Sequence, residues 1–177
     1  FRESSPNWER CFEIARQTMT LKAHVLSLDP WERSFGRVLL YGHLHAHSLE
    51  RISSLKVSHG LAVLFGLLVD IRLSGALMQQ YQELLEACRS TKVFDSQDIA
   101  EAACRPEADW RIAYFSDPKD QHLTHDEICY LNVKSCGCFA EPSVDFDETN
   151  VKRIAWDDFW IIFLNVIRDI SAGNCET

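Results

Sequence analysis

Residues 61–88 read LAVLFGLLVDIRLSGALMQQYQELLEAC and begin with the longest apolar run of the chain, Leu61 to Val69. In this run apolar residues occupy nearly every face of a helix, and further on they narrow to a single stripe. A helix that is apolar on all faces is typical of the centre of a domain. Because the run stops at Asp70, far short of the roughly 20 residues that a membrane span needs, we expect no transmembrane helix.

Helical spacing of apolar residues continues on both sides of this segment. Ser, Asp and Pro residues divide the chain into separate predicted helices, because these residues favour helix starts. The expected helices are one ending at Leu28, one from Pro30 towards Ile52, a short one between Ser96 and Arg105, and one from Asp109 to Phe115. Alternation of apolar and polar residues is not convincing over any strand length. The sequence therefore predicts an all-α protein.

The composition is that of a folded chain with an acidic C-terminal half. The 177 residues are 46% hydrophobic, with five Trp and ten Phe, which is enough to bury a full core. Residues 1–90 carry ten Lys/Arg and nine Asp/Glu, whereas residues 91–177 carry eight and seventeen. An acidic surface repels nucleic acid and attracts cations or basic partner segments, so we expect no nucleic-acid partner. An acidic face that only maintains solubility is the alternative.

The cysteines indicate a reducing environment. There are seven, an odd number, mostly within helical pattern, which favours reduced thiols in an intracellular compartment over a disulfide framework. Cys136 and Cys138, with Cys129, His122 and His125, form a possible zinc cluster. Their spacing of one residue is shorter than the usual two to four, so a loop glycine flanked by buried thiols is the preferred interpretation.

Two segments in the last third of the chain share a pattern. Residues 120–128 read DQHLTHDEI and residues 152–159 read KRIAWDDF. Each has a polar run, an aliphatic residue, a small residue, two variable positions, an acid and an apolar residue. In the second half of a helix-loop-helix calcium site, the aliphatic residue pairs with that of the partner loop and the acid closes on the ion. The pattern predicts that Leu123 pairs with Ile154.

These segments resemble the EF-hand superfamily. The resemblance implies an N-terminal helical region at 1–108, an EF-hand-like pair at 109–172 and a flexible tail at 173–177. It also implies a non-catalytic regulatory or scaffold protein that binds a partner helix or a larger assembly through an apolar groove. The residues expected to line or fill that groove are Trp156, Phe159, Trp160, Phe163, Leu164 and Ile167.

The calcium sites are expected to be largely lost. A working loop needs several side-chain oxygens, a glycine at its turn and a bidentate acid at its end. The candidate ligands in the first loop are Asp117, Asp120, Thr124 and Glu127. The second loop contains Lys152 and Arg153, and two cations disfavour a bound dication. We therefore expect no cofactor, with Ca²⁺ bound at low affinity at most.

The same two segments have a simpler interpretation as ordinary helix starts. Thr124 would be the N-cap and Glu127 its capping-box partner, and acids are favourable in the first turn of a helix.

Residues 38–47 read VLLYGHLHAH, and this element resembles the glycine-histidine-x-histidine motif of calcineurin-like metallophosphoesterases. The resemblance implies an alternative function, a truncated hydrolase that uses His43, His45 and His47 as metal ligands. Residues 1–37 lack the preceding carboxylate motifs of that family. His43 and His47 are one helical turn apart and can share a metal on a helix, with His45 pointing elsewhere. Polar residues on an exposed helix face are the favoured interpretation, and a purely structural subunit of a large complex is a further alternative.

Overall fold

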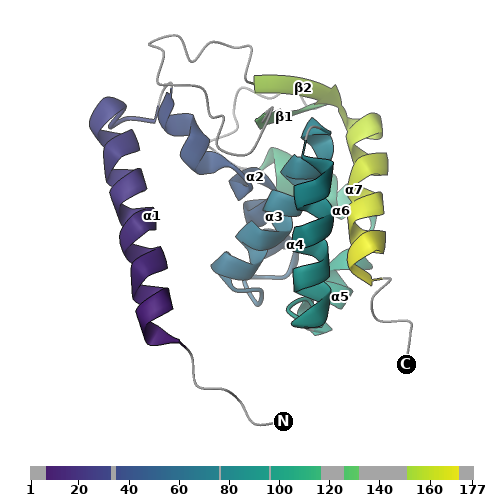
Figure 1. The fold of residues 1–177 in the computed structure, drawn as a ribbon. Helices are drawn as coiled ribbons and strands as arrows, with labels where there is room; N and C mark the ends of the chain where they lie inside the picture. The colour runs from purple at the N-terminus through teal and green to yellow at the C-terminus, as the bar shows by residue number, and fades with distance from the viewer. Residues whose placement is uncertain are drawn as a thin grey trace.

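The computed structural model describes residues 7–32, 35–75, 77–95, 97–116, 126–131 and 151–171. Most of these residues are helical, which confirms the all-α prediction (Figure 1). The elements are α1 (Trp8–Leu28), the 3₁₀ helix η1 (Phe35–Leu40), α2 (His43–Ile52), α3 (His59–Ser74), α4 (Met78–Ser90), α5 (Gln97–Ala103), α6 (Glu107–Phe115), the strands β1 (Glu127–Leu131) and β2 (Val151–Ala155), and α7 (Trp156–Ser171).

The central helix is α3, as its apolar composition predicts. Phe65, Leu68 and Val69 are at most 2% exposed, and α2, α4 and α7 pack around them. One hydrophobic core includes side chains from both predicted regions, residues 1–108 and residues 109–172. The boundary between these regions stays a prediction. None of the described helices is both long and apolar enough to cross a membrane.

Helix α1 lies apart from this core. Its first turn is capped by Asn7, whose side chain accepts a hydrogen bond from the Arg10 backbone N–H at 3.0 Å. Only Val25 of this helix is buried, whereas Phe12 is 74% and Met19 71% exposed. Figure 1 shows α1 standing beside the body formed by the other helices, next to η1.

The segment around Glu127 differs from the predicted calcium site. Glu127 begins strand β1, not an outgoing helix, and β1 pairs antiparallel with β2 so that Ile128 lies opposite Ile154. Leu123, the expected partner of Ile154, lies outside the described residues. The physical reason is burial, because Ile128 is 0% exposed. Ile128 and Tyr130 also belong to the β-branched and aromatic residue types that favour a strand. The helix start predicted in the second segment is confirmed, since α7 begins at Trp156 with Asp157 and Asp158 in its first turn.

Candidate functional site

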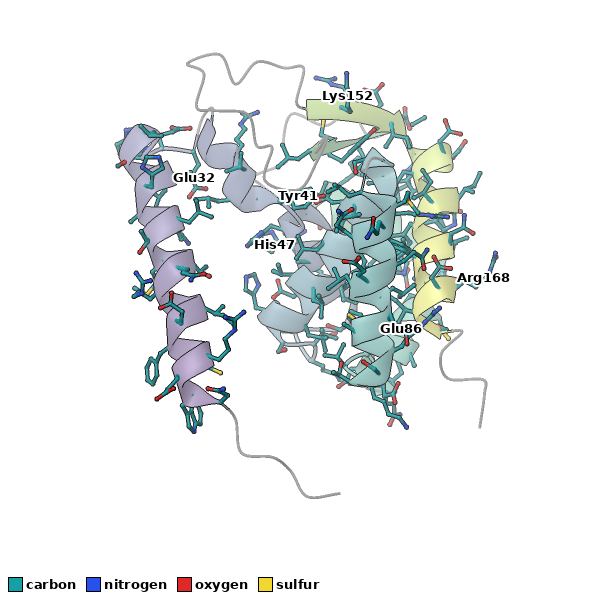
Figure 2. The ribbon with its side chains drawn as sticks, in the orientation of Figure 1. Glu32, Tyr41, His47, Glu86, Lys152 and Arg168 are labelled. Atoms are coloured by element: carbon teal, nitrogen blue, oxygen red, sulfur yellow. The ribbon has the colours of Figure 1, made fainter. Side chains whose placement is uncertain are left out.

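Helix α2 carries polar side chains on a face that is not part of the core. His43 and His47 are four residues apart and Glu50 is three further on, so all three lie on one side of the helix. His45 lies on the other side and is 0% exposed. Figure 2 shows His47 on the side of the helical body that faces α1.

A fourth side chain comes from the next helix. The short connection after Ile52 brings His59, the first residue of α3, back to the end of α2, where its Nδ1 lies 2.9 Å from the Glu50 carboxylate. The ring centroids of His43 and His59 are 5.4 Å apart, those of His43 and His47 5.9 Å, and those of His47 and His59 6.2 Å. We call His43, His47, Glu50 and His59 the histidine cluster.

Three residues of the histidine cluster have donor atoms placed for one metal ion, and the His43 ring lies beside them. One ligand atom from each of His47, Glu50 and His59 lies within 4.8 Å of the others. His43 holds its Nδ1 3.2 Å from the Tyr41 carbonyl oxygen, and this contact leaves Nε2 as the metal-binding nitrogen. Histidines that bind metal commonly donate their second ring N–H to such an acceptor. Three imidazoles and a carboxylate are a donor set suited to Zn²⁺ or a similar transition metal.

The electrostatic environment favours the neutral, metal-binding form of His43. Burial lowers the pKa of this imidazole, the Tyr41 carbonyl acts in the opposite direction, and electrostatic interaction with the His47 and His59 rings and the Lys22 ammonium group lowers the pKa further. Lys22 belongs to α1, so this exposed helix contributes a positive charge near the cluster.

The beginning of α2 is held against the middle of α3. Gly42 precedes α2 with φ of 78°, and a Cβ atom on Gly66 would lie 1.9 Å from the Gly42 carbonyl oxygen. The Gly42 N–H donates to the Asp70 carboxylate at 2.6 Å. These contacts fix the helix that carries two of the three clustered histidines.

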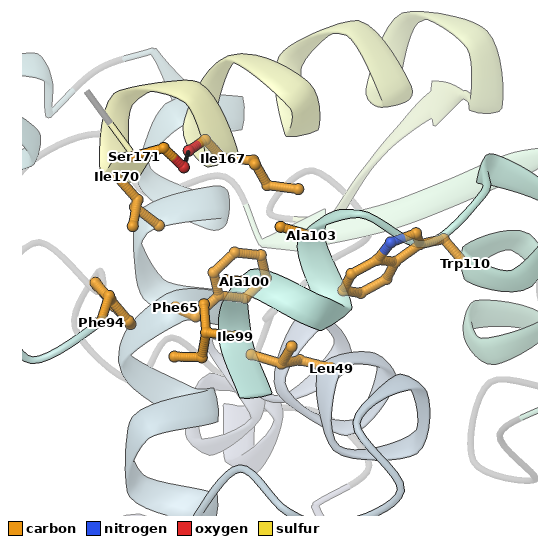
Figure 3. Close-up of a pocket in the computed structure, with 10 residues that line it drawn as sticks. All are labelled: Leu49, Phe65, Phe94, Ile99, Ala100, Ala103, Trp110, Ile167, Ile170 and Ser171. Carbon is orange, nitrogen blue, oxygen red and sulfur yellow. Dashed lines mark hydrogen bonds between the residues drawn. The ribbon is translucent and has the colours of Figure 1, made fainter. Parts of the chain in front are cut away.

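A separate hollow of the molecule carries no comparable chemistry. It is lined by Leu49, Phe65, Phe94, Ile99, Ala100, Ala103, Trp110, Ile167, Ile170 and Ser171 (Figure 3). The polar side-chain groups among its lining residues are the Trp110 indole N–H and the Ser171 hydroxyl, so among the described residues the histidine cluster is the better candidate for a functional site.

The residues predicted for calcium are not brought together in the described part of the chain. Asp117, Asp120 and Thr124 lie outside the described residues, as do Cys136 and Cys138. Glu127 faces Arg153 across the β1–β2 pair at 3.5 Å. The described residues do not test the assignment of these four positions as ligands.

The residues predicted to bind a partner all lie on α7, which buries some of them in the core and leaves others partly exposed. Trp156, Phe159 and Phe163 are at most 1% exposed and pack in the core, so their side chains are already covered within this chain. Trp160 and Ile167 are partly buried, and Leu164 is 38% exposed. Binding of a protein partner through the remaining surface stays a prediction.

The family of the chain follows from the segment that contains the cluster. A family model described as "3-dehydroquinate synthase C-terminal" matches residues 3–103, more than half of the chain and the whole histidine cluster. The chain belongs to this family. A "bifunctional 3-dehydroquinate synthase/phosphatase" of Fusobacterium nucleatum is 31% identical over 164 residues, which are 92% of this chain and 24% of that protein. No solved structure matches the chain.

Shorter similarities point to the same family. A "3-dehydroquinate synthase" of Chlamydia pneumoniae is 32% identical over 82 residues, 42% of this chain and 22% of that protein. Another from Clostridium tetani is 35% identical over 66 residues, 37% of this chain and 18% of that protein. The chain thus spans about a quarter or less of the length of these relatives.

Family membership corrects the functional interpretation of the sequence. The assignment to the EF-hand superfamily is wrong, as are the non-catalytic regulatory or scaffold function and the calcium-binding, scaffold description derived from it. The expectation of a protein that is not an enzyme is wrong too, because the family is named for an enzyme. The alternatives, a truncated metallophosphoesterase using His43, His45 and His47 and a purely structural subunit, are overturned by the same match. The structure explains why the first of these fails, since His45 points away from His43 and His47.

The sequence pattern identified two of the four residues of the histidine cluster, His43 and His47. The turn spacing of His43 and His47 predicted a shared face with His45 elsewhere, and this is what the structure shows. Glu50 and His59 were missed. Glu50 continues the spacing of the same face, which was a readable signal, whereas His59 stands on another helix and joins the cluster only through the turn between α2 and α3.

Proposed function

We propose that this chain supplies a transition-metal site to an enzyme of the 3-dehydroquinate synthase type. The observation that carries the proposal is the convergence of three imidazoles and one carboxylate from α2 and α3, within the segment that matches the family model. Members of this family normally use NAD and a metal ion.

The four donors fit the metal ion. His43, His47 and His59 would hold it through ring nitrogens, and Glu50 either adds an oxygen ligand or orients His59 through its 2.9 Å contact. A bound transition metal supplies Lewis acidity, which polarises an oxygen atom of the substrate. We assign NAD to no residue of the described part of the chain, because none of it forms a glycine-rich turn between a strand and a helix.

Lys22 would complement the metal ion on the α1 side. Its charge acts on His43, and the product named for the relatives, 3-dehydroquinate, is a carboxylate. An ammonium group beside a metal site favours binding of such an anion and keeps the neighbouring imidazole neutral.

Metal binding tests the proposal directly. Wild-type chain stripped with a chelator and titrated with Zn²⁺ or Co²⁺ should bind about one ion per chain. We expect His47→Ala and His59→Ala each to weaken binding by at least about 100-fold. His24→Ala, which removes an exposed histidine of α1 outside the cluster, should bind as the wild type does.

Calcium provides a second control. Nitrogen donors disfavour Ca²⁺, so millimolar Ca²⁺ should not displace Co²⁺ from the cluster. A wild-type chain that binds neither Zn²⁺ nor Co²⁺, or alanine variants that bind as tightly as the wild type, would overturn the assignment of the metal to this cluster.

A further inference from the structure

A buried polar network lies behind the histidine cluster. His45 of α2 has its Nδ1 2.8 Å from the Tyr114 hydroxyl of α6 and its Nε2 3.2 Å from Asp70 Oδ1 of α3. The second oxygen of Asp70 accepts the Gly42 N–H at 2.6 Å. His45 and Tyr114 are 0% exposed and Asp70 is 4% exposed, so the network does not meet a substrate.

Burying this polar network in the core costs free energy that apolar side chains at the same positions would not. Burying a histidine, a carboxylate and a phenol requires that each finds hydrogen-bond partners, and apolar side chains of the same volume often fill such a space at no loss of stability. The surroundings are apolar: the His45 ring stacks on Phe159 with a centroid distance of 5.6 Å. What the polar groups add is direction, because hydrogen bonds define an orientation that apolar contacts leave free.

The network sets where α2 begins and how the helix is rotated about its own axis. These two features determine where His43 and His47 lie. Asp70 holds the residue immediately before His43, which sets where α2 begins. His45 is anchored inward, and residue 45 lies about 200° around the helix from residue 43, so anchoring it turns His43 and His47 outward. A rotation of α2 by one residue would carry both imidazoles away from His59.

We propose that Asp70, acting with His45 and Tyr114, is a positioning residue that presents His43 and His47 to the metal ion. This inference rests on the proposed metal site. The buried network then contributes to metal affinity although it contacts neither the metal ion nor the substrate.

The test compares Co²⁺ affinity and the visible spectrum of bound Co²⁺, which reports ligand geometry. We expect Asp70→Ala to bind Co²⁺ about 10- to 100-fold more weakly with an altered spectrum. Asp70→Asn keeps an acceptor for the Gly42 N–H and should lie between Asp70→Ala and the wild type. Tyr114→Phe removes only one hydroxyl and should weaken binding several-fold.

A matched control separates positioning from general stability. Asp169 accepts a 2.6 Å hydrogen bond from Tyr81 away from the cluster, so Asp169→Ala should lower the melting temperature without changing Co²⁺ affinity or spectrum. If Asp70→Ala does not fold, Asp70→Asn and Tyr114→Phe decide. Wild-type affinity and spectrum in both folded variants would overturn the inference while leaving the metal site standing. Failure of the wild type to bind Co²⁺ would instead remove the proposed function itself.

Discussion

At the scale of single residues, two glycines let α2 and α3 cross closely. Gly42 takes a left-handed backbone conformation before α2, and Gly66 stands where the two backbones meet. The nearest atom to a Cβ on Gly66 belongs to the backbone of Gly42, so no flexible side chain can move aside. The crossing that supports the histidine cluster therefore depends on the absence of a side chain at this position.

We predict that Gly66→Ala lowers the free energy of unfolding by about 1–3 kcal/mol, because the added methyl group forces one helix to shift. Urea denaturation of metal-free protein measures this. Gly60→Ala is the control: a Cβ there meets nothing within 4 Å, and alanine in a helix is up to about 1 kcal/mol more favourable than glycine. Equal destabilisation by both substitutions would contradict the explanation from the crossing.

At the scale of the element, α7 shows how a helix rich in apolar residues is divided between core and surface. Phe159, Phe163, Val166 and Ile170 are buried, and Phe163 lies 4.8 Å from the Trp110 ring centroid and 5.6 Å from that of Phe65. Ile161 on the opposite side is 61% exposed. The buried face follows helical spacing, so the helix serves first to close the core.

We predict that Phe163→Ala destabilises the chain by about 3–5 kcal/mol, since it removes a fully buried aromatic ring that packs against rings of α3 and α6. Ile161→Ala should change the free energy of unfolding by no more than about 0.5 kcal/mol. Thermal or urea unfolding of the two variants measures the difference. A Phe163→Ala chain as stable as Ile161→Ala would mean that α7 does not close the core.

At the scale of the whole molecule, the core includes tyrosines that are protonated when buried. Burial, then the charge of Asp70, raises the pKa of Tyr114 well above its usual value. Burial also raises the pKa of Tyr81, and its hydrogen bond to Asp169 and the charge of that carboxylate raise it further. Both side chains are 0% exposed, and burial also raises the pKa of Tyr41 and of Tyr130, so the folded state keeps tyrosine protons that the unfolded chain loses near pH 10.

This difference predicts loss of stability at alkaline pH. The contribution of both groups is fully present below pH 10 and falls as the pH rises towards their folded pKa values, by up to about 3 kcal/mol per pH unit together. Urea denaturation between pH 9 and 11.5, followed by circular dichroism, measures the slope. Tyr81→Phe should be less stable at neutral pH, but its slope should be shallower by up to about 1.4 kcal/mol per pH unit. An unchanged slope in that variant would show that the buried tyrosine is not its source.

The sequence by itself determined the features that depend on neighbours along the chain. Apolar residues at helical spacing predicted the helical class and the central place of residues 61–69, and the turn spacing placed His43 and His47 on one face. The start of α7 after Ile154 also followed from its first-turn acids. These are local properties, because helix hydrogen bonds and side-chain faces involve residues three or four apart.

Tertiary structure decided the rest. Glu127 lies in a strand because Ile128 is buried beside a segment more than twenty residues away, and His59 completes the histidine cluster because the chain turns back after α2. Whether His45 would bind metal or anchor the helix depended on Asp70 and Tyr114, which come from two other helices. Contacts between distant residues have no fixed spacing in sequence, so no local pattern could specify them.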